Sequence, residues 1–242
     1  MDRQHSLPGG FGKAEYALLD PVALTDWQVY LLDLGNLDLT MNAYDHGLDR
    51  EMLTQRLFEL WRNGWIECMI GDGVVEPSLL VLQEQFAREG DWPRDSHPLF
   101  YQMAPIGGEV WESLTVIDWA KFVSWEFAYP ADGRKLKVMA SSDRELLGLA
   151  FASRKFLGGS WLVPGTERWS EVQPWRATYW KTLPVVGYQV ECQYEYEGPC
   201  QCLSDEEQIL CERACRELPE REHWRKSFEE VCAKHFKDGE TA

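Results

Sequence analysis

The clearest periodic pattern in the chain lies between residues 49 and 64. Apolar side chains recur there at helical spacing, with polar side chains at most of the positions between them: Leu53, Leu57, Leu60 and Trp61. Asp49 stands at the position of an N-cap, and Gly64 stands where such a helix ends. The pattern predicts an amphipathic helix over residues 49–63.

The rest of the first half alternates between helical and strand-like segments. Thr25 is predicted to cap a helix whose apolar side comprises Trp27, Tyr30, Leu31 and Leu34. Further helices are expected over residues 79–88 and 105–114, the second opened by Pro105. Short apolar runs predict strands at 65–70 and 99–103.

The second half is richer in strands. A strand is expected at 135–140, a helix from Asp143 to Phe156, and several aromatic-rich strands between Trp161 and Tyr196. The pattern of the C-terminal residues predicts two helices, separated at Pro219. We therefore expect an α+β protein: a winged-helix-like N-terminal half, then a small antiparallel sheet with a packed helix, and a C-terminal helical hairpin. The expected parts are a flexible lead-in at residues 1–24, a helical subdomain at 25–130, an α+β subdomain at 131–203 and the hairpin at 204–242. The turn at 129–133 is the expected main boundary.

The winged-helix expectation depends on residues 25–114. Their order is helix, helix, strand, glycine turn, strand, helix. The stretch FYQMAPIGGEVWESL resembles the second wing strand and the following helix of regulators of the multiple-antibiotic-resistance type, with matching positions at Tyr101, Met103, Ala104 and Gly107. The resemblance implies a fold that can bind DNA or contact proteins, although residues 71–99 would form an unusually long wing with its own helix.

Charge changes that picture. The chain carries a net charge of −16, with −13 on residues 1–130, +4 on residues 131–190 and −7 on residues 191–242. The helix over 49–63, which would enter a DNA groove, has three acidic and three basic residues. DNA affinity comes from basic residues that neutralise phosphates, so we expect no duplex binding. An acidic surface favours a basic partner, and solubility alone is the alternative.

Six of the seven cysteines lie in the last quarter of the chain. Three interpretations stay open: a zinc site, disulfides, or small apolar filling residues. The candidate metal ligands are Cys200, Cys202, Cys211, Cys215, Cys232 and His235. No C-x2-C pair occurs, so no cofactor is expected, with zinc as the exception to test.

The string PWRATYWKTLP interleaves aromatic and basic side chains. Trp, Tyr and Arg dominate protein-binding hot spots, so the exposed members of Trp175, Tyr179 and Trp180 are candidate contacts. The alternatives are a platform that stacks nucleic-acid bases and a half-buried strand. The sequence contains no G-x-S-x-G, P-loop, G-x-G-x-x-G or H-E-x-x-H motif, so no catalytic residue is predicted.

These observations favour a non-catalytic binding protein. In overall character the chain resembles acidic bacterial immunity and inhibitor proteins, which implies stoichiometric binding of a basic protein. The rivals are a winged-helix transcription regulator and an enzyme or metal protein that uses the cysteines. The expected acidic contacts are Asp33, Asp38, Asp45, Asp49 and Glu51. Residues 1–13 lack the apolar stretch of a signal peptide and no long apolar run exists, so a cytoplasmic location is expected.

Overall fold

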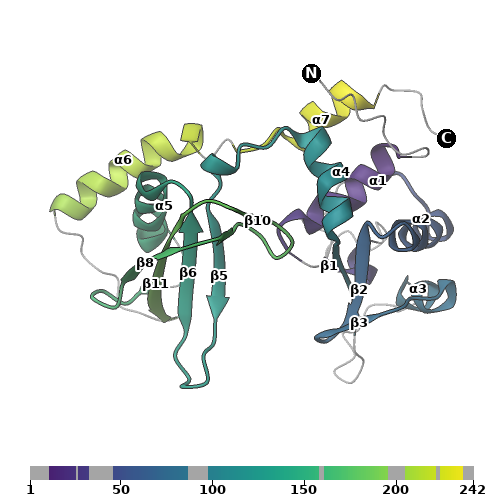
Figure 1. Cartoon of the computed structure of the whole chain (residues 1–242), viewed down its shortest axis with the longest axis horizontal. Helices are drawn as coiled ribbons and strands as arrows, with labels where there is room; N and C mark the ends of the chain where they lie inside the picture. The colour runs from purple at the N-terminus through teal and green to yellow at the C-terminus, as the bar shows by residue number, and fades with distance from the viewer. Residues whose placement is uncertain are drawn as a thin grey trace. The chain divides into compact units, whose positions relative to one another are not determined.

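The chain divides into two units, and the first takes residues from both ends of the sequence. In the computed structural model, unit 1 comprises Met1–Val116 and Lys226–Ala242, and unit 2 comprises Ile117–Arg225 (Figure 1). The structure describes residues 11–25, 27–32, 46–86, 98–157, 161–195, 205–221 and 224–236. Each unit combines helices with antiparallel strands, so the α+β expectation is confirmed.

Unit 1 surrounds a small antiparallel sheet with helices. Its strands pair in the order β1-β4-β2-β3: β1 (Trp27–Gln28), β4 (Leu99–Met103), β2 (Ile66–Ile70) and β3 (Gly73–Val75). Its helical segments are α1 (Lys13–Leu19), η1 (Pro21–Ala23), η2 (Val29–Leu32), α2 (Arg50–Arg62), α3 (Leu79–Phe86), α4 (Pro105–Thr115) and α7 (Phe228–His235).

Helix α2 matches its prediction closely. Asp49 caps it by accepting the backbone N–H of Met52 at 2.8 Å, and Gly64 follows its end with φ +71°. Leu53, Leu57 and Leu60 are buried on one side, as their spacing requires. The predicted strands at 65–70 and 99–103 and the helix at 105–114 are likewise confirmed.

The helix expected from Thr25 is wrong. Trp27 and Gln28 instead form β1, opposite Tyr101 and Phe100 of β4, and a 3₁₀ turn follows. The edge of β4 offers this segment backbone partners that outweigh its local helical preference. Residues 13–19, expected within a flexible lead-in, form α1 and bury four apolar side chains completely or almost completely: Tyr16, Ala17, Leu18 and Leu19.

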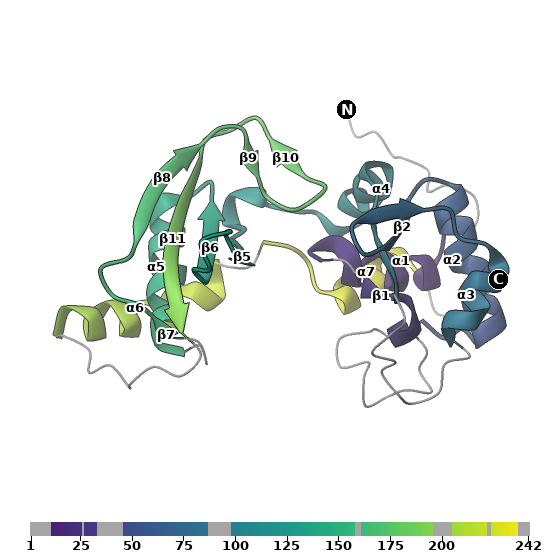
Figure 2. The ribbon, with the colours of Figure 1, turned by 90° about the horizontal axis from the view of Figure 1, so that it is seen from below.

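Unit 2 is built on β11 (Gly187–Glu195). One side of this strand pairs with β6 (Leu136–Ser141), which pairs in turn with β5 (Ser124–Ala128). The other side pairs with β7 (Trp161–Leu162) and β8 (Arg168–Val172). A separate ribbon pairs β9 (Trp175–Arg176) with β10 (Thr182–Leu183), as Figure 2 shows. The helical segments are η4 (Trp119–Lys121), α5 (Arg144–Leu157) and α6 (Asp205–Arg221).

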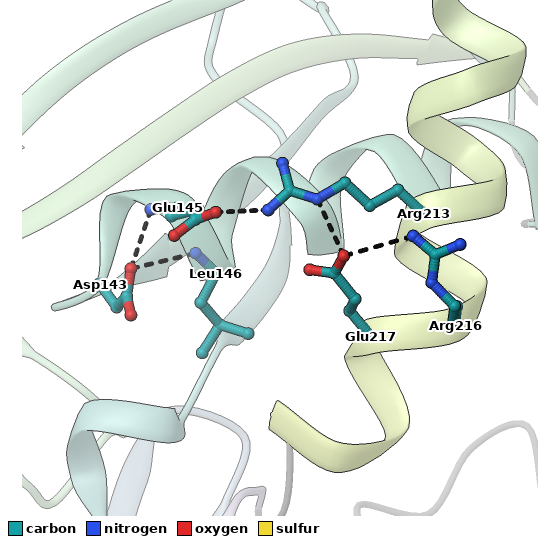
Figure 3. A network of polar contacts seen from close by, with 6 residues as sticks. All are labelled: Asp143, Glu145, Leu146, Arg213, Arg216 and Glu217. Atoms are coloured by element: carbon teal, nitrogen blue, oxygen red, sulfur yellow. Dashed lines mark hydrogen bonds and ion pairs between the residues drawn. The ribbon is translucent and has the colours of Figure 1, made fainter.

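Helices α5 and α6 cover one face of this sheet. Met139 of β6 and Val190 of β11 pack with apolar residues of both helices, among them Leu147, Ala214 and Leu218. Burial of these side chains holds the layers together. Polar contacts also join the two helices at their exposed side (Figure 3): Arg213 of α6 pairs with Glu145 of α5 at 2.5 Å and with Glu217 at 3.0 Å. Asp143 caps the start of α5 by accepting the N–H groups of Glu145 and Leu146.

Two expectations about organisation need correction. The turn at 129–133 joins β5 to β6 inside unit 2, and the chain passes between units at 116–117 and 225–226. The predicted break at Pro219 is wrong, because α6 continues through it, and the tail is divided between the units: α6 belongs to unit 2 and α7 to unit 1. Each helix has its own apolar partner, since α6 packs on α5 and Phe228 of α7 stacks on Tyr16, with ring centroids 5.3 Å apart.

Candidate functional site

The predicted acidic contacts are only partly within the described residues. Asp33, Asp38 and Asp45 lie outside them. Asp49 and Glu51 are exposed at the start of α2. The carboxylate of Asp49 also caps the helix, so its charge serves folding as well as the surface.

Most of the net charge belongs to unit 1. Unit 1 carries 23 acidic and 10 basic side chains, a net charge of −13, and unit 2 carries 17 acidic and 14 basic, a net charge of −3. Within unit 1, Arg56 is already paired with Glu15 at 3.3 Å and Glu59 at 3.0 Å. Several exposed carboxylates on different elements form no ion pair with any residue that the structure describes: Glu51, Asp72, Glu76, Glu84 and Glu109.

The aromatic strand divides into a buried and an exposed part. Trp175 is completely buried with Phe122, Ala140 and Ala177, and its ring lies directly over Gly187. It therefore cannot be a surface contact, contrary to one reading of the sequence. Tyr179 and Trp180 are partly exposed in the β9–β10 loop, in keeping with their role as candidates.

Hydrogen bonds fix the loop that carries these side chains. The backbone N–H of Lys181 donates to the Thr178 hydroxyl at 3.1 Å, and Ala177 donates to the carbonyl of Lys181 at 2.9 Å. The guanidinium of Arg176 donates to the carbonyls of Thr178 and Tyr179 at 3.4 and 3.1 Å. The loop thus holds Trp180 in a defined place, which limits the entropy lost on binding.

Two further tryptophans that the sequence analysis did not single out join Trp180. The ring centroid of Trp119 lies 6.1 Å from that of Trp180 and 5.8 Å from that of Trp224, and Phe122 lies 4.6 Å from Trp224 beneath them. We call Trp119, Trp180 and Trp224 the tryptophan cluster. All three are partly exposed and come from segments far apart in the sequence. Each has a basic residue within two positions after it, but Trp61 and Trp175 share that feature, so it does not identify the cluster.

Cations lie against the cluster. The ammonium of Lys181 is 5.9 Å from the ring centroids of both Trp119 and Trp180, and the guanidinium of Arg225 is 5.3 Å from that of Trp224. Such cation–π contacts order the long side chains at the surface. The cluster is therefore an aromatic surface with positive charge, suited to anchoring a partner through buried area and to accepting carboxylates or carbonyl groups.

The cysteine prediction stays untested. Cys200 and Cys202 lie outside the described residues, as does the side chain of Cys211. Cys215 is exposed on α6 of unit 2, whereas Cys232 and His235 lie on α7 of unit 1. Burial raises the pKa of the Cys232 thiol, and burial followed by Lys234 and Lys226 lowers the pKa of His235. Over the described ranges, no three His, Cys, Asp or Glu residues are grouped to hold a metal ion.

Among the helices that the structure describes, none has the length and apolar character needed to cross a membrane. Searches against protein-family models, curated proteins and solved structures found no match to the chain.

Proposed function

We propose that this chain is a non-catalytic acidic binding protein, of the immunity or inhibitor type, that binds a basic protein stoichiometrically in the cytoplasm. The observation that carries the proposal is the charge of −13 on unit 1, much of it on exposed carboxylates. Charge of one sign that is not neutralised internally attracts a macromolecule of the opposite sign.

The distribution of the carboxylates favours long-range attraction over one local contact. The unpaired ones lie on α2, on the β2–β3 turn, beyond β3, on α3 and on α4: Glu51, Asp72, Glu76, Glu84 and Glu109 respectively. Their summed field raises the association rate and weakens as salt screens it. Specificity must then come from another part of the surface.

The tryptophan cluster supplies that part. Large aromatic side chains that lose water on binding contribute most of the energy of many interfaces. Because Lys181 and Arg225 lie on the rings, the partner surface that meets the cluster should present carboxylates or backbone carbonyls. The basic residues of the partner are the ones that unit 1 attracts.

The first test is affinity capture with the immobilised full chain from cells that express it. We expect one basic protein, retained at low salt, eluted as salt rises and bound in a fixed stoichiometry by sedimentation analysis. Capture of only acidic or salt-insensitive partners, or turnover of a small molecule by the purified chain, would contradict the proposal.

The second test separates the contribution of the tryptophan cluster to binding from that of the long-range attraction by the carboxylates. Trp180→Ala should raise the dissociation rate of the captured protein by at least about tenfold, because truncating a hot-spot aromatic removes about 2 kcal/mol or more. Trp125→Ala is the matched control, since this tryptophan is 50% exposed on β5 outside the cluster. Equal effects of both substitutions would remove the cluster from the interface.

The alternative of a winged-helix regulator rests on resemblance alone. Helix α2 with its cap carries three basic and three acidic side chains, and Arg56 is already engaged by two carboxylates, those of Glu15 and Glu59. The helix therefore offers little net positive charge to neutralise DNA phosphates. Anisotropy titration with random duplex DNA should show negligible binding at physiological salt, and a micromolar, steeply salt-dependent affinity would favour the regulator instead.

A further inference from the structure

A polar cavity of about 220 Å³ opens in unit 2, away from the tryptophan cluster residues. Six of its eight lining residues have polar or charged side chains: Arg134, Thr166, Glu167, Arg168, Glu191 and Gln193. Side chains alternate along β11, and Val190 faces the helices, so Glu191 and Gln193 lie on the opposite face of the sheet. The cavity therefore lies on the sheet face that α5 and α6 do not cover.

The walls of the cavity are tied to the sheet. The hydroxyl of Thr166 accepts the backbone N–H of Gln193 at 3.1 Å and donates to the carbonyl of Val163 at 2.6 Å. The backbone N–H of Val163 donates to the carbonyl of Gln193 at 2.8 Å. Gly165, with φ +76°, allows the turn after which the chain pairs with β11 again. A site formed by a fixed turn and a central strand needs little rearrangement to bind a ligand.

The lining of this cavity carries two basic side chains, Arg134 and Arg168, and two acidic ones, Glu167 and Glu191. Arg168 and Glu191 are cross-strand partners in β8 and β11, yet within the described part of the chain no ion pair joins either of them to another residue. The carboxylate of Glu191 accepts one hydrogen bond, from the Gln189 amide at 2.9 Å. Arg134 uses its Nε–H on Asp132 at 2.7 Å, which orients the guanidinium and leaves its other N–H groups to donate.

We propose that this cavity binds a small zwitterion, a free α-amino acid with a short side chain. The ligand carboxylate pairs with the guanidinium groups of Arg168 and Arg134, and the ligand ammonium pairs with the carboxylate of Glu191. A ligand with one charge would meet repulsion from the group of like sign, whereas a zwitterion satisfies both.

The size of the cavity agrees with this class of ligand. Its volume equals that of about seven water molecules in the liquid, enough for a small amino acid. The pockets of drug-sized ligands are typically larger, from about 300 Å³ upward, so the size favours a small ligand. The site is separate from the proposed protein-binding surfaces and adds a ligand that they do not require.

The experiment is calorimetric titration of the full chain with glycine, alanine and serine, beside acetate and methylamine as single-charge probes. We expect at least one of the amino acids to bind, and acetate and methylamine to bind at least about tenfold more weakly. Arg168→Gln and Glu191→Gln should each weaken amino-acid binding by about tenfold or more, since each removes a charge-assisted hydrogen-bonding partner.

Glu171→Gln and Arg216→Gln are matched controls, because both residues are exposed outside the cavity. They should leave the affinity within about twofold of the unmodified chain, and circular dichroism should show all four variants folded. The proposal is overturned if none of the three amino acids binds, if acetate alone binds as tightly, or if the cavity variants behave like the controls.

Discussion

The two units differ in net charge and in the exposure of several of their tryptophans. Unit 1 buries Trp65 and Trp111 at 8% and 0% exposure and carries a net charge of −13. Unit 2 leaves Trp125 and Trp169 exposed at 50% and 44%, places cations on its tryptophan cluster and carries only −3. In the proposed function, this contrast assigns long-range attraction to unit 1 and short-range anchoring to unit 2.

Each unit has a glycine packed closely against a tryptophan, and substitution of these two glycines is expected to have the largest effects on stability. A Cβ at Gly107 of unit 1 would lie 2.0 Å from the backbone oxygen of Trp65, whereas one at Gly187 of unit 2 would meet the ring of Trp175 at 2.6 Å. Backbone yields less than a side chain, so Gly107→Ala should cost about 3 kcal/mol or more and Gly187→Ala less. Chemical denaturation of both variants measures this order.

Gly148→Ala is the control for that comparison. This glycine lies inside α5 with nothing within 4 Å of the added carbon, so alanine should stabilise the protein by about 0.5–1 kcal/mol. A smaller loss at position 107 than at position 187 would show that the close approach of α4 to Trp65 is not a fixed part of unit 1.

The pH dependence of the free energy of unfolding tests the burial of Cys68 in unit 1. Burial raises the pKa of this thiol to about 12 from 9.0. The folded protein therefore keeps the proton that the unfolded chain loses, and stability falls as pH rises above about 9. At pH 10 the loss from this group should be about 1 kcal/mol.

Urea denaturation at pH 8 and pH 10 checks that prediction. Cys68→Ala should remove this part of the pH dependence, whereas Cys215→Ala, at an exposed position on α6, serves as the matched control. Rapid reaction of Cys68 with a thiol reagent in the folded protein at pH 8 would contradict its burial.

A smaller effect concerns the exposed start of α2. Asp49→Ala should cost about 1 kcal/mol, because the N–H of Met52 loses its acceptor, whereas Asp49→Asn keeps a capping oxygen and removes the charge. Thermal unfolding of the two variants should show a lower Tm for alanine only. Equal losses would mean that charge, and not the hydrogen bond, stabilises the helix here.

How far the sequence predicted the fold depends on how local each signal was. Helix α2 was predictable because its cap, apolar stripe and terminal glycine lie within 16 residues. Strand β1 was not, since only pairing with β4, some 70 residues away, decides against a helix there. The partner of α7 depended on a stack between Phe228 and Tyr16, at opposite ends of the chain.

The candidate site shows the same limit. Trp180 and Tyr179 were singled out from one short string, but the burial of Trp175 depends on Gly187 and Phe122 from other elements. Trp119 and Trp224 come from distant segments of unit 2 that a backbone hydrogen bond joins, from the N–H of Asp118 to the carbonyl of Trp224 at 2.8 Å. No local pattern brings those two segments together.

The association rate of charge-matched variants with the captured basic protein tests the division of tasks most directly. Asp72, Glu84 and Glu109 of unit 1 are changed to lysine in one variant, and Glu171, Glu195 and Glu206 of unit 2 in the other; all six are exposed. Both variants gain six units of charge. The unit 1 variant should associate at least about tenfold more slowly at low salt, with a weaker salt dependence, and the unit 2 variant should change much less. Equal slowing in both variants would contradict the assignment of attraction to unit 1.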